Sequence, residues 1–217
     1  MKTFACPTRT LGLPGTLQAA ISQEGFTLAE FMLSTLILLV IAGSVFSLMG
    51  RTQRTASYQT EVQAVLENTR IAMETVERII QQAGNDPLGT GLQGVTITSA
   101  TEVNIRSDFT GSAGPGSPDQ GDSDGDTSDS GENVTIRYNA GNRTLETVAG
   151  GSVQPVASNI SAFSMQYFDK TGAVTNLGSE VRRVQITLTG TSPLADPQTG
   201  QVFSLQQTGD VKIQTRH

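Results

Sequence analysis

Hydrophobic and polar residues change their spacing along this chain. Between residues 26 and 49 nearly every side chain is apolar or small, and Glu30 is the one ionisable residue. About 20 apolar residues are enough to cross a bilayer as a helix. Between residues 62 and 83 the apolar residues recur every three or four positions, as in an amphipathic helix. The pattern therefore predicts one long helix, transmembrane in its first half and amphipathic in its second.

The sequence Gly84-Asn85-Asp86-Pro87 is typical of a helix end, and after it the hydrophobic period changes to two. Alternating segments predict short strands at 95–98, 103–106, 134–138, 143–148, 160–168, 181–188, 202–205 and 211–213. A Gly-containing turn joins the third and fourth segments, which predicts a β-hairpin. Residues 193–200 are polar with two prolines, so we expect a loop there. One long helix packed on an antiparallel β-sheet is an α+β fold.

The start of the apolar run carries a distinctive motif, Gly25-Phe26-Thr27-Leu28-Ala29-Glu30. A carboxylate inside an apolar segment costs about 2.5–3.5 kcal/mol on insertion scales, so Glu30 is expected to be functional. The motif resembles the cleavage site of type IV prepilins. The resemblance implies that a peptidase cuts after Gly25 and methylates the new N-terminal Phe26, and that Glu30 guides assembly. One departure is Glu24, where the family often has a basic residue.

Later segments add to this resemblance. Those at 70–84, 134–138, 160–169 and 181–188 look like PilW-type minor pilins. J-type pseudopilins of type II secretion systems share the same layout, so a secretion pseudopilin is the second interpretation. A third, of a different class, is a membrane-anchored, calcium-dependent binding protein that never assembles.

The pattern and the resemblance together divide the chain into four parts. Residues 1–25 are expected to be a cleaved leader, 26–50 a transmembrane and assembly helix, 51–84 an amphipathic helix, and 85–217 a β-rich domain. The resemblance implies a minor pilin that supports pilus initiation, adhesion or motility. Its implied partners are prepilin peptidase, the inner membrane before assembly, and other pilins through the N-terminal helix. The soluble domain would lie in the periplasm and then in the extracellular pilus.

Composition narrows the functional classes. The net charge of −6 argues against nucleic acid as the main partner, because binding phosphates needs clustered Lys and Arg. The only cysteine is Cys6 in the leader, and the only histidine is His217. A Ser-His-Asp or Cys-His catalytic arrangement is therefore not expected, and the sequence predicts no enzyme. Charges flank both ends of the apolar run, so the membrane orientation comes from the resemblance alone.

Residues 108–133 form an acidic loop rich in Gly, Ser and Asp. Its Asp122, Asp124 and Asp126 follow a D-x-D-x-D pattern, the spacing at which EF-hand-like loops place oxygen ligands for Ca²⁺. Asp129 or Glu132 would supply a further ligand, although the glycine and the bidentate glutamate of an EF-hand are out of position. The other interpretation is a solvated acidic loop without a ligand. Calcium is the one candidate cofactor, and both interpretations stay open from the sequence.

Overall fold

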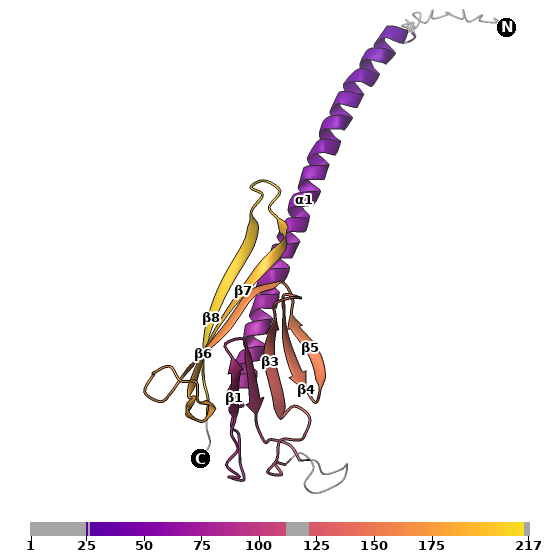
Figure 1. Cartoon of the computed structure of the whole chain (residues 1–217). Helices are drawn as coiled ribbons and strands as arrows, with labels where there is room; N and C mark the ends of the chain where they lie inside the picture. The colour runs from indigo at the N-terminus through magenta and orange to yellow at the C-terminus, as the bar shows by residue number, and fades with distance from the viewer. Residues whose placement is uncertain (1–24, 26, 112–121, 215–217) are drawn as a thin grey trace, which may run out of the picture. The chain divides into compact units, whose positions relative to one another are not determined.

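The structure, a computed structural model, describes residues 25, 27–111 and 122–214. The chain divides into two compact units, Met1–Met49 and Gly50–His217. Helix α1 (Leu28–Gln81) contributes to both, and the strands that follow it all belong to the second unit (Figure 1). A long helix followed by antiparallel sheets is the predicted α+β class. The combination is compatible with a pilin-like fold.

The strands form two antiparallel sheets (Figure 1). In the first, neighbouring strands pair in chain order: β1 (Val95–Ser99), β2 (Glu102–Arg106), β3 (Asn133–Asn139), β4 (Thr144–Ala149) and β5 (Ser152–Ala157). The second contains β6 (Ile160–Phe168), β7 (Arg183–Ala195) and β8 (Val202–Lys212). A short 3-10 helix, η1 (Gly178–Glu180), lies in the connection from β6 to β7. Every pairing is therefore between strands that follow each other in the chain.

One face of the second part of α1 is buried. Its fully or nearly fully buried residues are Val65, Thr69, Ala72, Met73, Val76 and Ile80. The last four join apolar residues from both sheets in a single core cluster. This confirms the face predicted from the periodicity, except that Ile79 is only partly buried and packs at the edge of the cluster. Burial of each larger aliphatic side chain stabilises the fold by about 1.5–3 kcal/mol.

The two sheets are also joined directly. The Tyr138 hydroxyl on β3 donates a hydrogen bond to the Ile160 carbonyl on β6 over 2.9 Å, and the Tyr138 ring lies 6.5 Å from that of Phe163. The Met165 amide on β6 donates to the Ala100 carbonyl in the β1–β2 turn over 2.7 Å. These bonds satisfy backbone groups at the junction and tie the two sheets to one core.

Two strand glycines let the second sheet approach α1 closely. A Cβ atom at Gly190 on β7 would overlap the side chains of Thr69 and Val65. A Cβ atom at Gly209 on β8 would likewise overlap Glu77 and Met73. Glycine at these positions therefore serves packing against the helix, because any side chain there would push the helix and the sheet apart.

The observed elements differ from the prediction in several places. The helix ends at Gln81, and Gly84 adopts φ +71°, as expected for a glycine after a helix end. Strand β5 was not predicted; it contains Pro155 and forms the edge of its sheet, where proline is tolerated. Strand β8 is continuous, whereas the sequence predicted two pieces around the polar residues 206–210.

The predicted loop at 193–200 is wrong for its first three residues. Strand β7 continues to Ala195, and its pairing with β8 is irregular between Thr191 and Ala195. Pro193 lies inside this irregular stretch, where the ladder does not require its missing N–H.

Replacement of Gly190 by alanine should destabilise the soluble unit. Overpacking of this kind costs about 1–3 kcal/mol, because the new methyl group must displace Thr69 or Val65 on the helix. The free energy of unfolding can be measured by urea denaturation of the full chain in detergent micelles. Gly141→Ala is the matched control, since its Cβ atom would meet only an ordinary contact, 3.4 Å from Asn139 Oδ1. Equal stability losses in the two variants would contradict this account of the helix–sheet contact.

Candidate functional site

The prepilin-like motif lies at the start of α1. Gly25 is exposed, and Phe26 lies outside the described residues. The Glu30 carboxylate accepts hydrogen bonds from the Thr27 amide and hydroxyl, both at 3.1 Å, and the Glu30 amide donates to the Thr27 hydroxyl over 3.3 Å. This reciprocal arrangement is a capping box, which satisfies N–H groups at the start of a helix. Thr27-x-x-Glu30 before an apolar run is the usual sequence signal for such a box.

The first part of α1 exposes its large apolar side chains within its own unit. Leu28, Leu39 and Phe46 each expose over 70% of their surface. Among the described residues α1 is the one helix long and apolar enough to cross a membrane. This is compatible with membrane anchoring, because such a surface needs lipid or other apolar side chains around it.

The described residues contain one group of three or more carboxylates placed to hold a metal ion, and it lies in the acidic loop. Asp124, Asp126 and Asp129 each offer an oxygen atom within 4.8 Å of the others. Glycine at position 125 allows the turn between the first two, with φ +94°. Local hydrogen bonds also shape the turn, since the Asp126 amide donates to Asp124 Oδ1 and the Ser128 amide to Asp126 Oδ1. The turn therefore brings the carboxylates of Asp124, Asp126 and Asp129 together.

Two buried carboxylates lie at the base of this loop, where β2 ends and β3 begins. Asp108 exposes 1% of its surface and Glu132 none. Glu132 Oε1 accepts hydrogen bonds from the Phe109 and Thr110 amides at 2.9 and 2.8 Å and from the Thr110 hydroxyl. Asp108 Oδ2 accepts one from the Gly125 amide at 3.0 Å. One oxygen of each carboxylate is therefore satisfied by donors from the loop.

Each of three carboxylates keeps one oxygen that is buried without a hydrogen-bond partner. In the part of the chain that the structure describes, these oxygens are Asp108 Oδ1, Asp129 Oδ2 and Glu132 Oε2. Burial raises the pKa of Asp129 above its usual range, and the negative charges of Asp124, Glu132, Asp126 and Asp108 add to the rise. The other four carboxylates are thus close enough to Asp129 to act on it. An unpaired buried carboxylate oxygen is costly unless a cation or a proton compensates it.

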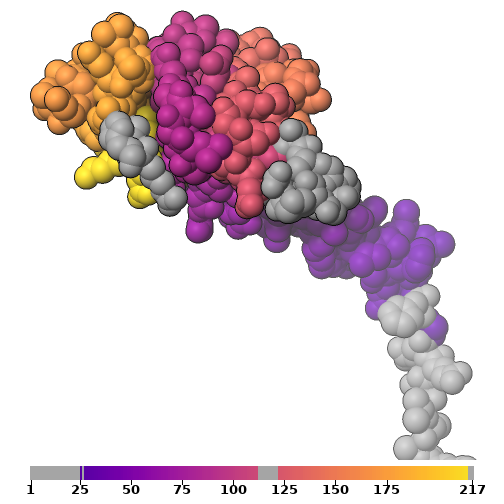
Figure 2. Space-filling view, turned by 90° about the horizontal axis from the view of Figure 1, so that it is seen from below, coloured from indigo at the N-terminus to yellow at the C-terminus, as the bar shows by residue number. Residues whose placement is uncertain are grey.

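The same segments connect to the end of α1. The Asp108 amide donates to the Asn85 carbonyl and the Asn85 side-chain amide donates to the Asp108 carbonyl, both at 2.8 Å. Figure 2 shows the corresponding surface, where the red residues after 122 lie beside the magenta segment that follows the helix. The acidic loop is therefore anchored at its base to the turn that ends the helix.

The structure and the sequence agree only in part on the members of the site. Asp124, Asp126 and Asp129 lie together, whereas Asp122, expected in the same set, is outside their group. Asp108 was missed. A signal was available, because antiparallel pairing of Arg106 with Asn133 brings the residues just beyond each strand together. The Ser107 amide accordingly donates to the Glu132 carbonyl over 2.9 Å.

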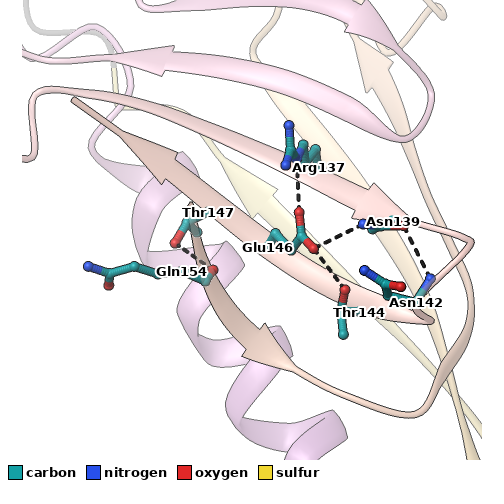
Figure 3. Close-up of polar contacts among 7 residues, drawn as sticks. All are labelled: Arg137, Asn139, Asn142, Thr144, Glu146, Thr147 and Gln154. Atoms are coloured by element: carbon teal, nitrogen blue, oxygen red, sulfur yellow. Dashed lines mark hydrogen bonds and ion pairs between the residues drawn. The ribbon is translucent and has the colours of Figure 1, made fainter. Parts of the chain in front are cut away.

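Another nearly buried carboxylate, Glu146 on β4, has every oxygen paired (Figure 3). Its Oε2 forms an ion pair with Arg137 Nε at 2.9 Å, and its Oε1 accepts from Asn139 and Thr144. The hydrogen bond from Arg137 is the main cause that lowers the pKa of Glu146, and the bond from Thr144 is the next. This network is a structural link across the β3–β4 hairpin. It contrasts with the acidic loop, where buried oxygens lack donors.

Comparison with known proteins adds no assignment. No protein-family model matches the chain, and no curated protein matches its sequence significantly.

The Glu146 network should make stability depend on pH. Because the pKa of Glu146 is lowered in the fold, its contribution is present above the unfolded-state value of about 4.3 and is lost as pH falls through the lowered folded-state pKa. Glu146→Gln should therefore cost about 1.5–3 kcal/mol at pH 7 and much less at pH 3. Thermal unfolding of the full chain in micelles measures both. The exposed Glu67→Gln is the control, and an equal loss at both pH values would refute this role for Glu146.

Proposed function

We propose that this chain is a minor pilin of a type IV pilus, made as a membrane-held precursor and cut between Gly25 and Phe26. The observation that carries the proposal is the motif at residues 25–30 directly before the apolar part of α1. The cut chain would remain in the inner membrane with its β-domain in the periplasm. It would then enter the pilus through its N-terminal helix.

The exposed apolar surface of α1 supports an assembly role. A helix with exposed leucine, isoleucine, valine and phenylalanine side chains is compatible with lipid, and equally with the apolar faces of other helices. Exchange of lipid for neighbouring pilin helices would keep these side chains out of water throughout. The helix thus suits both the waiting precursor and the assembled fibre, and the proposed role is structural rather than enzymatic.

Glu30 would favour contact with a neighbouring pilin over contact with lipid. In a bundle, the carboxylate can pair with the positively charged N-terminal amine of a neighbour's Phe26, and the low dielectric would strengthen that attraction. Within its own chain the same carboxylate caps the helix through Thr27. The two roles need different properties of the side chain, since capping needs only a hydrogen-bond acceptor and pairing needs a charge.

Two other functions fit the same fold. A pseudopilin of a type II secretion system would use the same helix and the same cut, and genomic neighbours would separate it from a pilus subunit. A membrane-anchored, calcium-dependent binding protein is favoured by a different observation, the carboxylate cluster of the acidic loop. Such an anchor needs no cut, so the N-terminal residue of the protein in cells distinguishes it from both pilin types.

Gly25→Leu should block processing. A peptidase that binds an extended chain can require a residue without a side chain at the cut, and a leucine would obstruct it. The variant should stay in the membrane as a precursor heavier by residues 1–25, detected by immunoblotting and intact mass. Gly43→Leu makes the same exchange within the helix, at a site with open space around it, and should be cut normally. Normal cutting of Gly25→Leu would contradict the proposed cleavage site, whereas a wild-type chain that keeps residues 1–25 would favour the anchored binding protein.

Substitutions at residues 27 and 30 separate charge from capping. If Glu30 acts through its charge, Glu30→Gln and Glu30→Leu should both reduce the amount of this chain in sheared pili by about tenfold or more, whereas Thr27→Val should have little effect. A reduction of at least this size is expected when one buried charge pair is lost. Glutamine is itself a capping-box residue. Wild-type incorporation of Glu30→Gln together with a loss in Thr27→Val would therefore assign the residue to capping and remove its assembly role.

A further inference from the structure

We infer that the acidic loop is a calcium site whose ligands come from Asp108, Asp124, Asp126, Asp129 and Glu132. The inference is independent of the proposed function, since it concerns the soluble unit alone. It adds Asp108 to the residues expected from the sequence and leaves out Asp122.

Unpaired buried oxygens, and not acidity alone, carry this inference. Asp108 and Glu132 are at least 99% buried, yet each keeps one carboxylate oxygen without a partner among the described residues. The buried Asp129 Oδ2 is in the same condition. Asp129 belongs to the group whose oxygens lie within 4.8 Å of one another. One cation can be coordinated by oxygens of several carboxylates at once, which a single hydrogen-bond donor cannot do.

The hydrogen bonds direct Asp108 and Glu132 into the loop. Asp108 Oδ2 is held by the Gly125 amide, between the two aspartates that lead the cluster. The Glu132 amide donates to the Asp129 carbonyl over 3.3 Å, so the chain turns back on itself between these ligands. Both residues are therefore held beside the segment that carries Asp124, Asp126 and Asp129.

The bonding of Glu132 leaves one of its oxygens for an ion. Its Oε1 accepts three hydrogen bonds, two of them from backbone amides, whereas its Oε2 is buried without a partner among the described residues. Such an oxygen is costly unless a cation compensates it. The ligands are all carboxylate oxygens, which suits a hard cation and excludes the sulfur- and imidazole-based sites typical of zinc. Calcium accepts six to eight oxygens in flexible geometry, whereas Mg²⁺ requires a near-ideal octahedron.

A bound ion would order the base of the loop and with it the turn after the helix. Asp108 connects the site to Asn85 through two hydrogen bonds of 2.8 Å, one between backbone groups and one from the Asn85 side-chain amide. Because an ion that binds only the folded state stabilises it, calcium should raise the melting temperature. The effect should be about 3–6 °C when calcium is about ten times its dissociation constant.

The test uses the full chain in detergent micelles, freed of metal with a chelator. Calcium chloride alone is titrated by calorimetry, and thermal unfolding is recorded with and without calcium. We expect binding heat with a dissociation constant on the order of 10⁻³ M or tighter, and a weaker response to magnesium chloride. No heat and no thermal shift at about 10 mM calcium, roughly ten times the weak end of that range, would overturn the inference. An equal response to magnesium would overturn the choice of calcium.

Single substitutions then test the ligand set. Asp129→Asn and Glu132→Gln should each weaken calcium binding on the order of tenfold or more. Asp129→Asn should also melt higher than the wild type in chelator, because it removes one of the repelling charges. That gain shows that the variant folds, so its loss of calcium binding cannot be blamed on unfolding. Asp122→Asn is the matched control from the same loop and should bind as the wild type does. Binding that survives Asp129→Asn, or is lost in Asp122→Asn, would contradict the assignment.

Discussion

Burial of one face of the second part of α1 is the contact on which the soluble unit depends. Ala72, Met73, Val76 and Ile80 are the only helical contribution to a core that includes residues of both sheets among those described. Among the described residues α1 is the one α-helix, and the other helical element is the three-residue η1. Close approach requires glycine at positions 190 and 209, so the sequence of the second sheet is constrained by the helix it covers. Loss of this face would therefore expose both sheets at once.

Elements could be predicted where the hydrophobic pattern of a segment matches the element that it packs against. The core face of α1 and strand β6 follow from a single hydrophobic period, and the turn at Gly84 follows from glycine's freedom to adopt positive φ. Strands β5 and β8 could not be predicted, because their stability comes from the neighbouring strand. Pro155 is tolerated only since β5 has a free edge, and the polar middle of β8 is held by β7 along its length. The hydrophobic pattern of a single segment shows neither the free edge of β5 nor the pairing of β8 with β7.

The candidate sites also combine features set by local sequence with features set by neighbouring strands. Spacing predicted that Asp122, Asp124 and Asp126 would share a site, and the last two lie together with Asp129 while Asp122 does not. Asp108 required knowledge of strand register, since the pairing of Arg106 with Asn133 brings residues 107–108 close to Glu132. The capping of α1 by Thr27 and Glu30 could be predicted from four residues. The cost of a charge in an apolar run instead predicts a role for Glu30 in assembly. One side chain can serve both, and the sequence does not rank them.

The strand order has a kinetic consequence. Because every sheet pairing joins consecutive strands, most of the sheet closes through short loops, and short loops lose little entropy on closure. The pairing of β2 with β3 is the exception among the first five strands, since the whole segment 107–132 lies between them. Closure of that hairpin should be the slow step of the first sheet, and carboxylates that repel one another there would slow it further. The folding rate of the domain would then depend on the ionic composition of the compartment in which it folds.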